Sequence, residues 1–161
     1  MSKILANIKY LLAPVLILVT FAGVLAGGIF AWLGVALLFV GIIIDTLIKK
    51  QASSQMHGDS GETLASPMFQ NLVMYFMLPV FVLLQLALAW RVYGFMSGMP
   101  VEVTSVWMGL IPITSGITGL DLIGATLSTG IFAGIGIIYG HELSHTKGFA
   151  FIISRMTMAL S

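Results

Sequence analysis

The feature that most constrains the fold is an apolar run, residues 10–44, that contains no charged side chain. A helix crosses the bilayer core with about 20 residues, so this run is too long for one span and fits two spans joined by a tight turn. Gly27 and Gly28 are the predicted turn, because glycine tolerates the backbone angles that a chain reversal needs. We therefore predict helices at about residues 9–26 and 29–48.

The rest of the chain repeats this apolar pattern around one polar stretch. Residues 49–67 are rich in serine and glycine and hold His57, and they predict a surface loop. Further helices are expected at about residues 68–92 and 119–146. The apolar segment at about residues 105–118 contains Pro112 and several glycines, which predicts a re-entrant or interfacial piece.

Two features of these helices predict what surrounds them. Trp90, Arg91 and Tyr93 close the third helix and are typical of a belt at the membrane–water interface. The glycine pairs 130/134 and 136/140 have the small-xxx-small spacing that lets a second helix approach closely.

The composition of the chain also indicates an integral membrane protein. Hydrophobic residues make up 58% of the 161 residues and charged residues only 8%, whereas a soluble domain carries about 25% charged residues. The predicted fold is all-α, a polytopic integral membrane helical bundle with about four transmembrane helices. The chain has no cysteine, which excludes disulfides and thiolate metal sites. Its net charge of +1 is uninformative about nucleic acid, and since no basic run indicates such a partner, none is expected.

Basic residues predict the orientation. Six of the seven lie before the first helix, after the second or after the fourth, at Lys3, Lys9, Lys49, Lys50, Lys147 and Arg155, and Arg91 alone lies at the end of the third. Because basic residues concentrate on the cytoplasmic side, both ends of the chain are expected there, and we predict a bacterial inner membrane as the location. The end of the fourth helix then faces the cytoplasm.

That end carries the sequence HELSH, residues 141–145. His141 and His145 are four residues apart, so they share one face of a helix and can bind one metal. In a zinc protease, Glu142 would act as the general base and a third ligand would be needed. Asp121 lies 20 residues upstream, about 30 Å along a helix, and no His, Asp, Glu or Cys follows the motif. The motif by itself does not determine which metal is bound.

Residues 124–147, GATLSTGIFAGIGIIYGHELSHTK, resemble the first histidine-box region of the membrane alkane monooxygenases. These are non-haem diiron enzymes related to membrane fatty acid desaturases and hydroxylases. Weaker similarity covers the preceding helices, in GIIIDTL with Asp45, in YFMLPV and in LDLIGATLS with Asp121.

This resemblance implies an integral-membrane monooxygenase that hydroxylates an alkane or alkyl chain with O2. His141 and His145 would be ligands of a centre of two non-haem irons, and Glu142 would orient a ligand histidine through a hydrogen bond. A rubredoxin- or ferredoxin-type protein would donate the electrons, and membrane lipid would surround the helices. A fatty acid desaturase or hydroxylase of the same superfamily is the nearest alternative.

The family uses further histidine clusters downstream, whereas this sequence has three histidines in total. We therefore expect residues 1–161 to be the N-terminal part of one membrane domain in a longer enzyme, inactive by itself. Its remaining iron ligands would lie outside this chain.

Overall fold

The computed structural model of the chain describes residues 3–52, 67–106, 111–145 and 147–160. The described elements, in chain order, are α1 Lys3–Ala26, the 3-10 helix η1 Gly28–Trp32, α2 Leu33–Ala52, α3 Pro67–Met96, β1 Val103–Val106, β2 Ile111–Thr114, α4 Gly119–Ser144 and α5 Phe149–Ala159. Most of the predicted loop 49–67, including His57, lies outside the described residues.

The predicted membrane helical bundle is confirmed. Among the described residues, three helical stretches are long and apolar enough to cross a membrane, Gly28–Leu47, Met68–Met96 and Gly119–Ser144. The stretch Tyr10–Ala26 is also apolar but shorter, and it belongs to the 24-residue helix α1.

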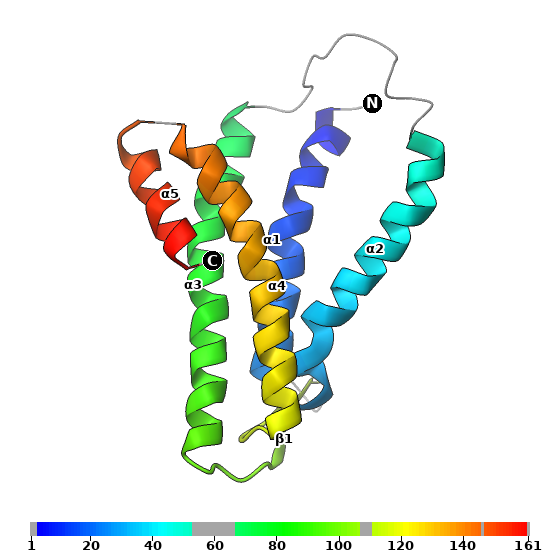
Figure 1. The fold of residues 1–161 in the computed structure, drawn as a ribbon, viewed down its shortest axis with the longest axis vertical. Coiled ribbons are helices and arrows are strands. Elements are labelled where there is room, and N and C mark those ends of the chain that lie inside the picture. The colour runs from blue at the N-terminus through cyan, green and yellow to red at the C-terminus, as the bar shows by residue number, and fades with distance from the viewer. Residues whose placement is uncertain (1–2, 53–66, 107–110, 146, 161) are drawn as a thin grey trace.

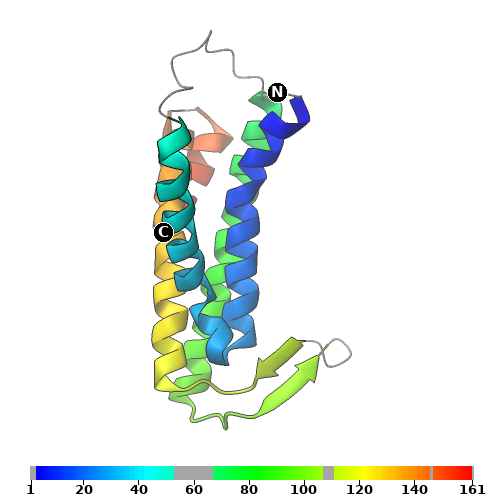
Figure 2. The ribbon, with the colours of Figure 1, turned by 90° about the vertical axis from the view of Figure 1, so that its right-hand side faces the viewer.

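The helices alternate in direction between two ends of the bundle (Figure 1). We call the end where α1 and α3 begin and α2 and α4 finish the histidine end, because His141 and His145 lie there. At the opposite end, the strands β1 and β2 form an antiparallel pair in which Val103 faces Thr114 and Val106 faces Ile111. This hairpin, which projects beside the helices in Figure 2, takes up part of the segment predicted to be re-entrant or interfacial.

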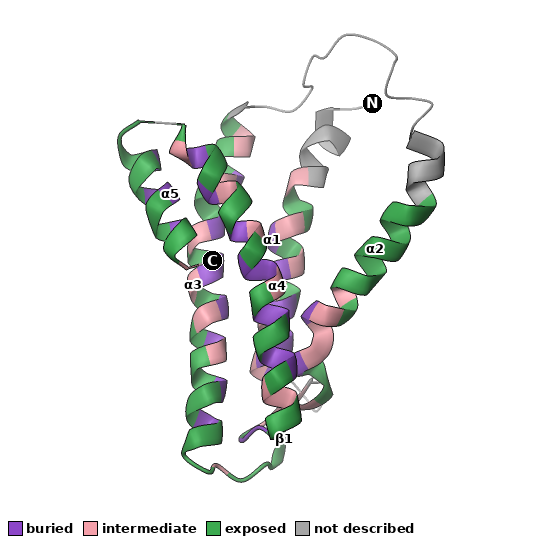
Figure 3. Cartoon of the chain, in the orientation of Figure 1, coloured by how far each residue is buried: buried purple, intermediate pink, exposed green. Residues whose placement is uncertain are grey.

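The core lies where α1, α3 and α4 meet, with buried residues such as Ile17, Phe81, Leu84 and Phe132. By contrast, α2 diverges from the bundle toward the histidine end and is largely exposed there (Figure 3). Many large apolar side chains lie on the outer surface of the helices. Such a surface suits contact with lipid, since acyl chains are as apolar as leucine.

The turn between α1 and α2 occurs at the predicted glycines, which have positive φ angles of 71° at Gly27 and 54° at Gly28. The predicted interfacial belt at the end of α3 was wrong for Arg91. Trp90 and Tyr93 are exposed, as an interfacial belt requires, but Arg91 is only 1% exposed and lies beneath the turn. Its donors bind the carbonyl oxygens at the C-terminus of α1, so it belongs to the interior.

Candidate metal centre

Two histidines converge at the last turn of α4. The Nε2 atoms of His141 and His145 lie 3.4 Å apart, and the two ring planes are almost perpendicular, at 88°. Both side chains are exposed, and His145 caps the C-terminus of the helix. The spacing of four residues therefore brings the two ring nitrogens together on one face of α4.

This separation fits a shared metal ion. Two nitrogen ligands about 2.1 Å from one metal, at an angle of about 90–110°, lie about 3.0–3.4 Å apart. Imidazole is a suitable ligand for both iron and zinc. The pair can therefore supply two ligands through Nε2, and each Nδ1 is left to be oriented by another group.

The described residues provide no third ligand beside the pair, since no group of three or more His, Cys, Asp or Glu side chains lies together among them. Thr118 caps the start of α4, and Asp121 lies in the first turn there, at the end of the helix opposite the histidines. The Asp121 backbone N–H donates to Thr118 Oγ1 at 3.1 Å, and the Asp121 carboxylate accepts a hydrogen bond from the same hydroxyl at 2.7 Å. The acidic residue nearest to the pair is thus Glu142, within the motif.

Glu142 lies between the two histidines in the sequence and Lys147 follows them, and both side chains are exposed. Within the described part of the chain the Glu142 carboxylate has no hydrogen-bond partner, so its predicted role in orienting a ligand histidine stays a prediction. The Ser144 hydroxyl donates to the carbonyl oxygen of His141 at 2.6 Å. This bond lies within the last turn of α4, which holds both histidines.

The two glycine pairs of α4 have different surroundings. A Cβ atom added at Gly140 would meet the backbone oxygen of Ser154 at 3.2 Å, so α5 packs closely there. A Cβ at Gly130 or Gly134 would meet no described atom within 4 Å. The histidine face of α4, defined by Ile123, Leu127, Gly130, Gly134, Ile138, His141 and His145, is exposed along its length.

An apolar groove runs between α2 and α4, beside the histidine face. It encloses about 330 Å³ and is lined by Leu16, Leu37, Leu38, Gly41, Ile42, Asp45, Ile131, Phe132 and Ile135. Ile135 lies about 9 Å along the helix axis and about 120° around it from His141, and Ile131 lies about 21 Å along the axis and about 40° around it from His145. The carboxylate of Asp45 is the charged group of this lining.

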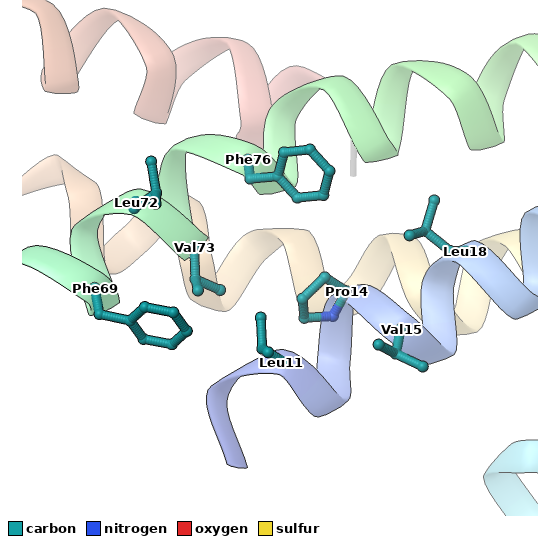
Figure 4. A pocket seen from close by; sticks show the side chains of 8 residues that line it. All are labelled: Leu11, Pro14, Val15, Leu18, Phe69, Leu72, Val73 and Phe76. Carbon is teal, nitrogen blue, oxygen red and sulfur yellow. The ribbon is translucent and has the colours of Figure 1, made fainter. Parts of the chain in front are cut away.

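A second apolar groove, of about 290 Å³, lies between α1 and α3 (Figure 4). Its lining consists of Leu11, Pro14, Val15, Leu18, Phe69, Leu72, Val73 and Phe76. No residue of α4 lines this second groove. Of the two grooves, the α2–α4 groove is therefore the one that is lined by the helix that carries the histidines.

The sequence did not predict helix α5 or its contacts with α4 and α3. Ser154 of α5 donates to the Gly140 carbonyl at 2.6 Å, and Gln85 of α3 donates to the Leu160 carbonyl at 2.7 Å. The sequence did contain a signal for α5. The residues that this helix buries recur at the three- and four-residue spacing of a helix, at Ala150, Ile153, Ser154 and Thr157.

Comparison with protein-family models, with curated proteins and with solved structures finds no match for this chain.

Proposed function

We propose that the chain contributes His141 and His145 to a non-haem diiron centre in an integral-membrane monooxygenase that hydroxylates an alkane or alkyl chain. The observation that carries the proposal is the convergence of the two Nε2 atoms, 3.4 Å apart, at the end of a membrane helix. The other iron ligands would come from protein outside the described residues, since no group of three or more His, Cys, Asp or Glu side chains lies together among them.

The bound irons would supply the redox chemistry with O2 that places an oxygen atom in a C–H bond. The residues of this chain hold and orient the metal. Each histidine binds as the neutral imidazole through Nε2, which leaves the Nδ1–H group free to donate a hydrogen bond. Glu142 is the carboxylate of the motif that would accept such a bond and fix one ring.

The α2–α4 groove supports an alkyl substrate. Its lining is apolar apart from Asp45, and it begins about 9 Å along α4 from His141. A hydrocarbon chain in this groove would be shielded from water along the helix that carries the metal ligands. A zinc protease that uses HELSH, with Glu142 as general base, is less well supported, because a peptide needs polar groups for its backbone and neither groove offers a polar lining.

The histidine end lies on the cytoplasmic side of a bacterial inner membrane in this proposal. Lys49 and Lys50 near the end of α2 and Lys147 after α4 all belong to that end, and basic residues concentrate on the cytoplasmic side. A soluble rubredoxin- or ferredoxin-type electron donor would reach the metal there. A desaturase or fatty acid hydroxylase would use the same site and the same partners.

The test is the metal content and activity of the protein in membranes. We expect His141→Ala and His145→Ala each to weaken iron binding by more than about 100-fold, since even the loss of a group that orients a ligand costs about 10–100-fold. Hydroxylation of an n-alkane, with electron donor and O2 supplied, should be lost with the iron. Thr126→Ala, a polar change near the other end of α4, should preserve both properties.

Retention of iron and activity in either histidine variant would contradict the ligand assignment. Stoichiometric zinc in place of iron in the purified protein, together with peptide hydrolysis, would favour the protease. Formation of a C=C bond from an acyl chain would favour the desaturase.

A further inference from the structure

Helix α5 folds back onto the residue that precedes the histidine motif. The chain reverses after α4 through Gly148, whose φ angle is 74°, and α5 then packs against α4 and α3 (Figure 1). The hydroxyl of Ser154, which is fully buried, donates to the backbone carbonyl of Gly140 at 2.6 Å. A side chain of α5 is thereby bonded to the backbone directly next to His141.

The contact is close because residue 140 has no side chain. A Cβ at this position would lie 3.3 Å from the backbone nitrogen of Met158, and nearer still to the Met158 side chain. One turn later Leu143, 1% exposed, packs with Ala150 and Ile153. Gly140 and Leu143 therefore form the face of the last α4 turn that α5 covers.

The far end of α5 is also anchored. Gln85, in the middle of α3, donates its side-chain amide to the Leu160 carbonyl at 2.7 Å. A carbonyl at a helix C-terminus has no partner within the helix and needs one in an apolar environment. The helix is therefore fixed at Ser154 to α4 and at its end to α3.

This packing determines which way the histidines face. At 100° per residue, the mean direction of Gly140 and Leu143 is about 150° from that of His141 and His145. The last turn of a helix frays readily, and His145 is already the capping residue. If this turn rotated or unwound, the two Nε2 atoms would no longer lie 3.4 Å apart.

We propose that α5 acts as a brace for the metal ligands and that Ser154 is a positioning residue, acting on His141 and His145 through the Gly140 carbonyl. The inference rests on the proposed function, since it requires that the two histidines bind metal. Ser154 does not touch the metal or a substrate. It holds the last turn of α4 in the helical state in which the two ring nitrogens converge.

The test uses the 161-residue chain in lipid nanodiscs, titrated with Co²⁺ as the probe and followed by its visible absorption. We expect Ser154→Ala to weaken Co²⁺ binding about fivefold, the equivalent of one lost hydrogen bond, and to change the absorption spectrum of the bound ion. Thr20→Ala is the matched control, because its buried hydroxyl bonds only within α1, to the Leu16 carbonyl at 2.9 Å. This control should leave the affinity and the spectrum unchanged.

A second pair of variants tests the same contact without removing the hydroxyl. Gly140→Ala should weaken Co²⁺ binding because the new Cβ pushes against Met158, and Met158→Ala in the same chain should restore part of the affinity. Circular dichroism would establish that each variant keeps its helices.

The outcomes separate the brace from the metal site. If Ser154→Ala and Gly140→Ala keep the wild-type affinity and spectrum, or if Thr20→Ala weakens binding equally, the brace is wrong while the metal site stands. If the wild-type chain binds Co²⁺ no better than His141→Ala does, the two histidines do not hold a metal ion in this chain and the brace fails. The proposed diiron function is tested separately, by the iron content of the histidine variants.

Discussion

Arg91 lies inside the bundle, and its guanidinium completes the C-terminus of another helix. Its Nε–H donates to the Val24 carbonyl at 2.8 Å, Nη2 donates to the Leu25 carbonyl, and Nη1 donates to the Thr114 carbonyl at 2.7 Å. The last carbonyls of α1 have no partner within the helix and carry partial negative charge. Since lipid offers them no hydrogen bond, the arginine joins α1, α3 and the hairpin.

Arg91→Leu should therefore destabilise the protein, because several buried carbonyl oxygens lose a charged donor. We expect the free energy of unfolding to fall by about 3 kcal/mol, measured by denaturation in mixed micelles. Arg155 offers a matched control, since its side chain is exposed and lies over the Phe151 ring, with its guanidinium carbon 5.6 Å from the ring centroid. Equal stability of Arg91→Leu and Arg155→Leu would contradict the capping role.

At the scale of elements, the contact between α2 and α4 depends on Gly34 and Ser128. The hydroxyl of Ser128 donates to the Ala31 carbonyl at 2.8 Å and accepts a hydrogen bond from the Val35 backbone N–H at 3.3 Å. It thus satisfies one of the unpaired N–H groups at the start of α2 from a different helix. A Cβ at Gly34 would lie 2.6 Å from Ser128 Cβ and 2.9 Å from Ser128 Cα, so only glycine permits this approach.

Gly34→Ala should lower the free energy of unfolding by about 1–2 kcal/mol. Overpacking costs about 1–3 kcal/mol and outweighs the gain in helix propensity of up to about 1 kcal/mol. The same substitution at Gly41 meets no described atom within 4 Å, and it should leave stability unchanged or raise it. The comparison requires denaturation curves of both variants, and the reverse order of stability would show that α2 and α4 do not approach closely at Gly34.

At the scale of the whole molecule, the divergence of α2 leaves the apolar groove open beside the histidine face. Gly41→Trp should fill this groove. If the proposed hydroxylation takes place, we expect the KM for a long alkyl substrate to rise about tenfold while iron content and kcat stay near wild type. Leu72→Trp, which fills the α1–α3 groove instead, is the control. If the two tryptophan variants behaved alike, the α2–α4 groove would not be the substrate site.

The sequence predicted those features of the structure that depend on residues close together in the chain. Hydropathy located the apolar helices, since a helix that crosses a bilayer core needs about 20 apolar residues. Glycine chemistry located the turn at Gly27, and helical periodicity placed His141 and His145 on one face. The partners of Arg91 and the helix α5 were not predicted, because each depends on segments that are distant in the chain.

The sequence by itself determined a membrane helical bundle with a histidine pair at the end of one helix. Only the tertiary structure decided that α5 covers Gly140, that Gly130 and Gly134 face no described residue, and that Arg91 is buried. The physical reason is that lipid and protein interior are equally apolar. A transmembrane helix such as α4 is therefore apolar on nearly all sides, and its composition does not reveal which face a neighbouring helix will cover.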